Sequence, residues 1–120
     1  MLSLDRTKIE LRSLEIQSAW SELHDRAHDV LRGAEHSSPE EAWLNYLIGK
    51  ALVGLGRSEA ALHWLQRSLR LQPAQSHAQY LMGFALAAHG EWLAALAAQQ
   101  CACGLDPSYA DAWYEQGRAA

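Results

Sequence analysis

Apolar residues in the middle of the chain recur at helical spacing, in blocks that turn residues separate. Within residues 44–55 the apolar side chains fall on one side of a helix. Gly56-Arg57 interrupts this pattern, and a second apolar stripe follows over residues 61–69. Gln72-Pro73 ends that stripe, because the residue before a proline avoids the helical region. The pattern predicts a helix, a tight turn and an antiparallel helix.

The same pattern extends along the whole chain and predicts further helices. Pro39 followed by two glutamates is typical of a helix start, where proline fits the first turn and acids favour the positive end of the dipole. The segment 5–35 lacks a glycine at its expected turn, so one long helix is an alternative there. We expect helices near residues 5–19, 22–35, 40–54, 58–71, 75–88, 92–105 and 109–120.

Four residue types recur at an interval of 34 residues, which indicates an internal repeat. The small residues would let the two helices of a unit approach closely, and a bulky residue there would overpack by about 1–3 kcal/mol. The recurrent sets are Gly49, Gly83 and Gly117; Pro39, Pro73 and Pro107; Ala27, Ala61 and Ala95; and Tyr46, Tyr80 and Tyr114.

The period and its residues resemble the tetratricopeptide repeat, whose pattern opens with Trp-x2-Leu-Gly-x2-Tyr and ends with proline. Asn45-x2-Ile48-Gly49-x2-Leu52 matches this opening apart from the tryptophan, and Gln79-x2-Met82-Gly83-x2-Leu86 repeats it. Trp113-x2-Gln116-Gly117-x2-Ala120 opens another copy. The resemblance implies an all-α fold: a right-handed α-solenoid of antiparallel helix pairs, with about seven helices.

The copies divide the chain unevenly. We expect residues 1–39 to form a degenerate repeat or an N-terminal cap, with Glu15 where the glycine belongs. Residues 40–73 and 74–107 form one repeat each, and residues 108–120 supply the first helix of a truncated repeat. That last helix exposes apolar residues such as Trp113 without a partner helix. We therefore expect either a longer protein that continues the array or a homodimer through the C-terminal helix.

The resemblance also implies a binding face, because such solenoids bind partners on a concave surface lined by the first helix of each repeat. Tyr46, Tyr80 and Tyr114 would form a ladder there, and tyrosine is a low-entropy anchor for a peptide. Packing of these aromatic rings between helices is the alternative. The candidate residues are Trp43, Tyr46, Lys50, Val53, His77, Tyr80, Phe84, Asp111, Tyr114 and Arg118.

Composition narrows the classes of partner. The net charge of −4 argues against nucleic acid and membrane surfaces as partners, since both need excess Lys and Arg. No stretch is apolar for the roughly 20 residues of a membrane span. The two cysteines, Cys101 and Cys103, lie on opposite sides of a helix and are interpreted as small buried packing residues. We expect a soluble protein in the reducing cytoplasm.

One short motif has the spacing of a metal-binding pair of histidines. His24 and His28 are four positions apart, with Asp25 between them, and two such histidines can share a metal. A third ligand is not evident, and a solvated helix explains the pattern. A metallohydrolase at this pair is therefore only an alternative. We expect no catalytic site, no cofactor and no metal.

These observations favour a non-catalytic protein–protein interaction module, a scaffold that binds a peptide or a partner domain and belongs to a longer protein. Two alternatives stay open. One is a docking or regulatory segment of a larger enzyme, such as a glycosyltransferase or methyltransferase. The other is a small stand-alone chaperone of the secretion type.

Overall fold

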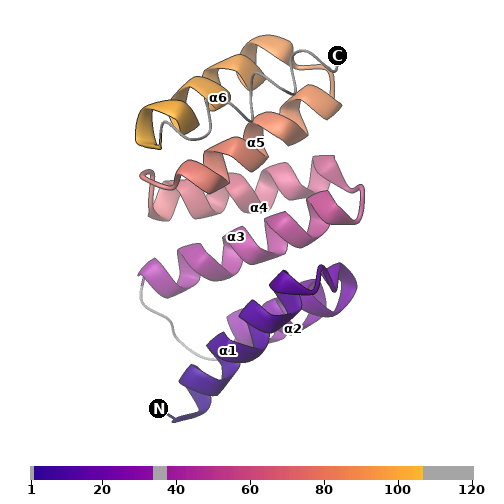
Figure 1. The fold of residues 1–120 in the computed structure, drawn as a ribbon, viewed down its shortest axis with the longest axis vertical. Helices are drawn as coiled ribbons and strands as arrows, with labels where there is room; N and C mark the ends of the chain where they lie inside the picture. The colour runs from indigo at the N-terminus through magenta and orange to yellow at the C-terminus, as the bar shows by residue number, and fades with distance from the viewer. Residues whose placement is uncertain (1, 34–37, 107–120) are drawn as a thin grey trace.

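The chain folds into helical hairpins stacked along one axis (Figure 1). A computed structural model describes residues 2–33 and 38–106, and within these ranges the fold is all-helical, as the sequence predicts. The predicted helix 109–120, the residue Trp113 and the homodimer contact lie outside the described residues. The helices are α1 (Leu2–Ile16), α2 (Trp20–Gly33), α3 (Ser38–Gly54), α4 (Ser58–Leu71), α5 (Ser76–Ala88) and α6 (Trp92–Leu105).

The turns of the second and third hairpins are equivalent. Gly56 and Gly90 have φ of 78° and 85°, a left-handed conformation that glycine adopts without strain. Arg57 N–H donates to the Leu52 carbonyl at 2.8 Å, and Glu91 N–H donates to the Leu86 carbonyl at 2.9 Å. Each bond closes the Schellman motif that ends a helix. The two glycines are 34 positions apart, so the turn chemistry keeps the period of the sequence.

The first hairpin uses the same turn without glycine. Ser18 has a φ of 55°, and Ala19 N–H donates to the Leu14 carbonyl at 3.0 Å. Residues 5–35 are thus two helices and not one long helix. Ser18 lies 38 positions before Gly56, so the turn comes four residues, about one helical turn, earlier than the 34-residue period predicts. The first hairpin is therefore out of register with the other two.

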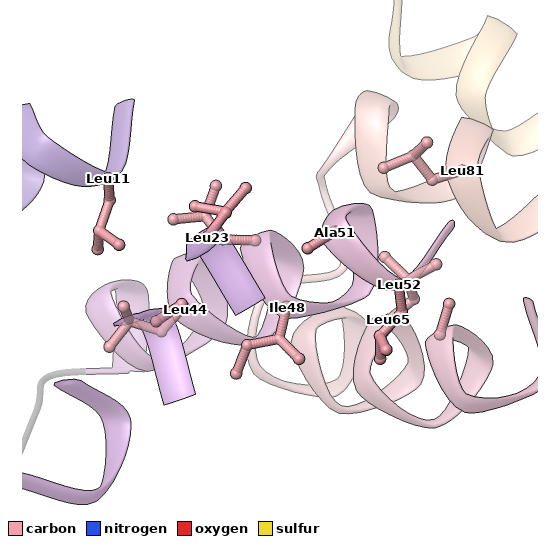
Figure 2. Close-up of a cluster of buried hydrophobic side chains, with 11 residues drawn as sticks. Leu11, Leu23, Leu44, Ile48, Ala51, Leu52, Leu65 and Leu81 are labelled. Atoms are coloured by element: carbon pink, nitrogen blue, oxygen red, sulfur yellow. The ribbon is translucent and has the colours of Figure 1, made fainter. Parts of the chain in front are cut away.

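One large core cluster joins the first two hairpins and reaches α5 (Figure 2). Its side chains come from the facing stripes of α1 to α5, which the sequence pattern placed at helical spacing. Within the described residues, a second cluster between α5 and α6 has Leu86, Ala95 and Ala98 as its buried members. The residues of the large cluster are Leu11, Leu23, Ala27, Leu44, Leu47, Ile48, Ala51, Leu52, Ala61, Leu65 and Leu81.

Buried polar contacts fix the junction of the second and third hairpins. Ser68 of α4 is fully buried and its hydroxyl donates to the Ala42 carbonyl of α3 at 2.6 Å. The side-chain amide of Gln75 donates to the carbonyls of Ser68 and Gln72, at 3.1 and 2.8 Å. The Gln75 amide thus gives the Gln72 carbonyl at the end of α4 a partner, and adds a second donor to the Ser68 carbonyl, which also accepts from the Gln72 N–H at 2.9 Å. These bonds hold the start of α5 against α4, and so position the residues of α5 beside α3.

Candidate binding face

An aromatic row crosses from α3 to α5. The rings of Tyr46 and His77 meet edge to face with centroids 5.6 Å apart, and His77 stacks on Tyr80 at 6.2 Å. All three residues are half-buried. Tyr80 is one repeat after Tyr46, and the ring of His77 lies next to both. The row therefore presents ring surface and polar atoms together, next to solvent.

An ion pair joins α1 to α3 beside this row. Lys50 Nζ lies 2.7 Å from Glu15 Oε2, and these side chains are only 23% and 19% exposed. The Tyr46 hydroxyl donates to the same carboxylate oxygen at 3.4 Å. Partial shielding from solvent strengthens such a pair relative to one on the open surface. The contact neutralises Lys50 and orients Tyr46.

The surroundings of His77 lower the pKa of its imidazole. Burial lowers its pKa below the ordinary value of 6.5, the nearby Lys50 lowers the pKa further, and Glu15 partly opposes them. The imidazole is therefore neutral at pH 7. A neutral imidazole has one nitrogen that donates and one that accepts a hydrogen bond, and the Nε2 atom of His77 is buried.

Two adjoining hollows run between α1 and α3. Arg12 and Trp43 border both of them. One hollow, of about 560 Å³, is also lined by Lys8, Ile9, Pro39 and Glu40. The other, of about 460 Å³, is also lined by Glu15, Ile16, Tyr46 and Lys50. Both are open and together form a groove that leads from α1 to the aromatic row.

The other predicted residues occupy different environments. Val53 is half-buried and packs against the large core cluster, whereas Phe84 is 41% exposed. Pro73 is exposed in the loop after α4. Asp111, Tyr114 and Arg118 lie outside the described residues, as do Pro107 and Gly117, so the predicted ladder is described only at its first two tyrosines.

The small residues of the repeat lie where helices pack. A Cβ added at Gly49 would be 2.7 Å from the side chain of Leu65, and one added at Gly83 would be 2.5 Å from that of Gln99. Ala61 is fully buried and Ala95 is 5% exposed. The two helices of each pair thus approach closely at the recurrent glycine.

The contribution of α1 to the groove was not predicted from the sequence. The 34-residue interval pairs Arg12 with Tyr46, but the turn at Ser18 shifts this pairing by four residues. Aligned by their turns, α1 and α3 correspond at an interval of 38 residues. Lys8 of α1 is then equivalent to Tyr46 of α3. Likewise Arg12 is equivalent to Lys50, and Glu15 to Val53. Aligning the first hairpin by its turn, and not by the repeat interval, would have found them.

The remaining candidates do not join the groove. His24 and His28 have ring centroids 5.9 Å apart, and the edge of His28 meets Trp64. Within the part of the chain that the structure describes, no three metal-ligating side chains gather. Cys101 is exposed and Cys103 is only half-buried, so the interpretation of the two as buried packing residues is wrong: neither lies on the buried stripe of Ala95, Ala98 and Ala102.

Over residues 2–33 and 38–106, no helix has both the length and the apolar character that crossing a bilayer requires.

Comparisons with known proteins agree with the helical-hairpin architecture. YrrB, described as a TPR protein with an unusual peptide-binding site, matches with a TM-score of 0.71 and 30% identity over 87% of this chain and 52% of YrrB. MamA (MSR-1 C2) matches with a TM-score of 0.70 and 18% identity over 85% of this chain and 56% of its own. The chain spans about half the length of each. No protein-family model and no curated protein matches it. The resemblance seen in the 34-residue period is confirmed: the chain has the fold of the tetratricopeptide repeats.

Proposed function

We propose that the chain is a non-catalytic interaction module that binds a peptide along the face of α1, α3 and α5. The observation that carries this proposal is the aromatic row of Tyr46, His77 and Tyr80, which is half-buried and continuous across two repeats. A row of that kind offers an apolar surface at low entropic cost, because these side chains are already held by their neighbours.

A peptide is the partner that the chemistry of the row fits best. Tyrosine and tryptophan provide broad contact area with few rotatable bonds, and such residues dominate binding energy at interfaces. The half-buried ring of His77 joins the two tyrosines into one continuous surface. The adjoining hollows have room for individual side chains, not for a folded domain. The likeness to YrrB supports the same proposal, since that protein is described as having a peptide-binding site.

The test begins with a selection of random peptides displayed on phage against the purified chain. Selected peptides are then titrated by calorimetry into the wild-type chain and into Tyr80→Ala. We expect Tyr80→Ala to weaken binding about 10- to 100-fold, as loss of an aromatic anchor does.

Leu55→Ala is the matched control, because it removes an exposed apolar side chain, 43% exposed, at the turn after α3 and away from the row. Its affinity for the selected peptides should equal that of the wild type. Thermal unfolding of both variants establishes that they fold. The proposal is wrong if folded Tyr80→Ala binds the selected peptides as tightly as the wild type, or if no peptide is selected.

A further inference from the structure

Positive charge is unevenly distributed along the binding face. Lys50 is neutralised by Glu15 at 2.7 Å. Lys8 and Arg12 of α1 are exposed, and neither forms an ion pair with any residue of the described ranges. They are four positions apart and so project from the same side of α1. The end of the groove at α1 therefore carries two solvent-exposed cations that no acid of the described residues neutralises.

Apolar walls stand directly beside these cations. The hollow of about 560 Å³ that Lys8 and Arg12 line is also lined by the apolar residues Ile9, Pro39 and Trp43. Ile9 is 69% exposed, so its aliphatic side chain is accessible to a partner from the hollow. Trp43 is held in place because part of its ring packs against the core. A partner side chain would thus meet a fixed aromatic surface.

The sign of the local charge is opposite to that of the whole chain. Lys8 and Arg12 outnumber Glu40, the acid that lines the same hollow, although the chain as a whole carries −4. Screening by salt limits interactions between exposed charges to about 8–10 Å, so a bound group experiences this lining more than the distant acids. The lining therefore has a net positive charge, which favours an anionic group over a cationic one.

We infer that this hollow accepts an acidic peptide, with one apolar side chain packed on Trp43 and Ile9 and a neighbouring Asp or Glu carboxylate on Arg12 and Lys8. The inference rests on the proposed peptide-binding function and adds the chemistry of the partner. The planar guanidinium of Arg12 accommodates the two oxygens of a carboxylate, and the Lys8 ammonium adds a second charge.

The probes are peptides of twelve residues, capped at both ends, with one central leucine. Acidic, neutral and basic versions carry Glu, Gln or Lys at the positions flanking the leucine. Calorimetry at low salt should give an affinity for the acidic peptide about tenfold above that for the neutral one, the sum of two exposed charge contacts. Raising the salt concentration should remove this preference.

The double variant Lys8→Gln, Arg12→Gln should bind the acidic and neutral peptides equally. The charge-reversed variant Lys8→Glu, Arg12→Glu should prefer the basic peptide, a gain that damage to the fold would not produce. Arg57→Gln with Arg70→Gln is the matched control, because it removes two exposed cations and changes the net charge equally outside the groove. This control should keep the acidic preference.

The outcomes separate this inference from the proposed function. If the peptides bind and Tyr80→Ala weakens them, but the acidic version has no advantage, the groove function stands and the acidic specificity is wrong. If an uncapped neutral peptide matches the acidic one, the cations bind a chain terminus and the assignment to side-chain carboxylates is overturned. If none of the peptides binds and the selected ones do not either, both proposals fail.

Discussion

Position 99 holds a polar side chain where the preceding repeat has a leucine. Gln99 lies against Gly83 as Leu65 lies against Gly49, and both side chains are buried. The Gln99 amide nitrogen makes one long bond, 3.4 Å, to the Tyr80 carbonyl. Its oxygen Oε1 is buried without a hydrogen-bond partner among the described residues. We therefore predict that Gln99→Leu stabilises the fold.

The magnitude follows from three terms. Removing an unsatisfied buried acceptor should raise the free energy of unfolding by about 1–3 kcal/mol, and losing one weak hydrogen bond should lower it by about 0.5–1.5 kcal/mol. The additional apolar carbon of leucine adds about 0.8 kcal/mol per buried methylene. The net expectation is a gain in the free energy of unfolding of about 2 kcal/mol. For a chain of this length, that corresponds to a rise in Tm of about 8 °C.

Thermal and urea unfolding followed by circular dichroism measure this gain. The reciprocal change, Leu65→Gln, should lower the free energy of unfolding by about 3 kcal/mol, since it buries an amide in the larger core. A Gln99→Leu protein that is equally stable or less stable would refute the reasoning. That result would mean that the amide of Gln99 contributes more than its visible contacts explain.

Two further predictions concern single positions. Gly49→Ala should destabilise the fold by about 1–2 kcal/mol, because a Cβ there meets Leu65 at 2.7 Å, whereas Gly104→Ala, with no atom within 4 Å, should be neutral or slightly stabilising in urea unfolding. The pKa of His77 is lower in the folded chain than its ordinary 6.5, so the folded state binds fewer protons and stability falls as pH drops below about 6.5. His77→Phe keeps an aromatic ring but cannot be protonated, so it should lose less free energy of unfolding than the wild type between pH 7 and pH 5. If the variant loses as much stability as the wild type over this range, His77 is not the group responsible.

The sequence was most informative where local signals coincide with the repeat. Helices α3 to α6 begin and end within two residues of the predicted bounds. Gly56 and Gly90 mark their turns, since the left-handed conformation favours glycine and leaves a visible signature. The turn of the first hairpin could not be located from the sequence, because Ser18 adopts the same left-handed conformation without being a glycine. One long helix thus remained an alternative there until the structure located the break.

The candidate site was less predictable than the fold, for a physical reason. The tyrosines are periodic and could be found by counting. Glu15 and Lys50, in contrast, are 35 positions apart and form their ion pair only because the early turn brings α1 one helical turn out of register. The same shift directs Lys8 and Arg12 into the groove. Contacts between repeats depend on how hairpins stack, and periodicity within the sequence does not encode that offset.

Helix α5 contributes both to the core and to the aromatic row of the candidate binding face. Tyr46 stands on α3, which packs within the leucine-rich cluster, whereas His77 and Tyr80 stand on α5, whose partner α6 contributes mainly alanine. In a solenoid each repeat is stabilised mostly by its neighbours, and within the described residues α6 buries fewer large apolar side chains than α3 or α4. The Gln99 amide of α6 donates to the Tyr80 carbonyl of α5, so the packing of α6 bears directly on the helix that carries His77 and Tyr80. A change at position 99 therefore acts on the support of the aromatic row as well as on the core.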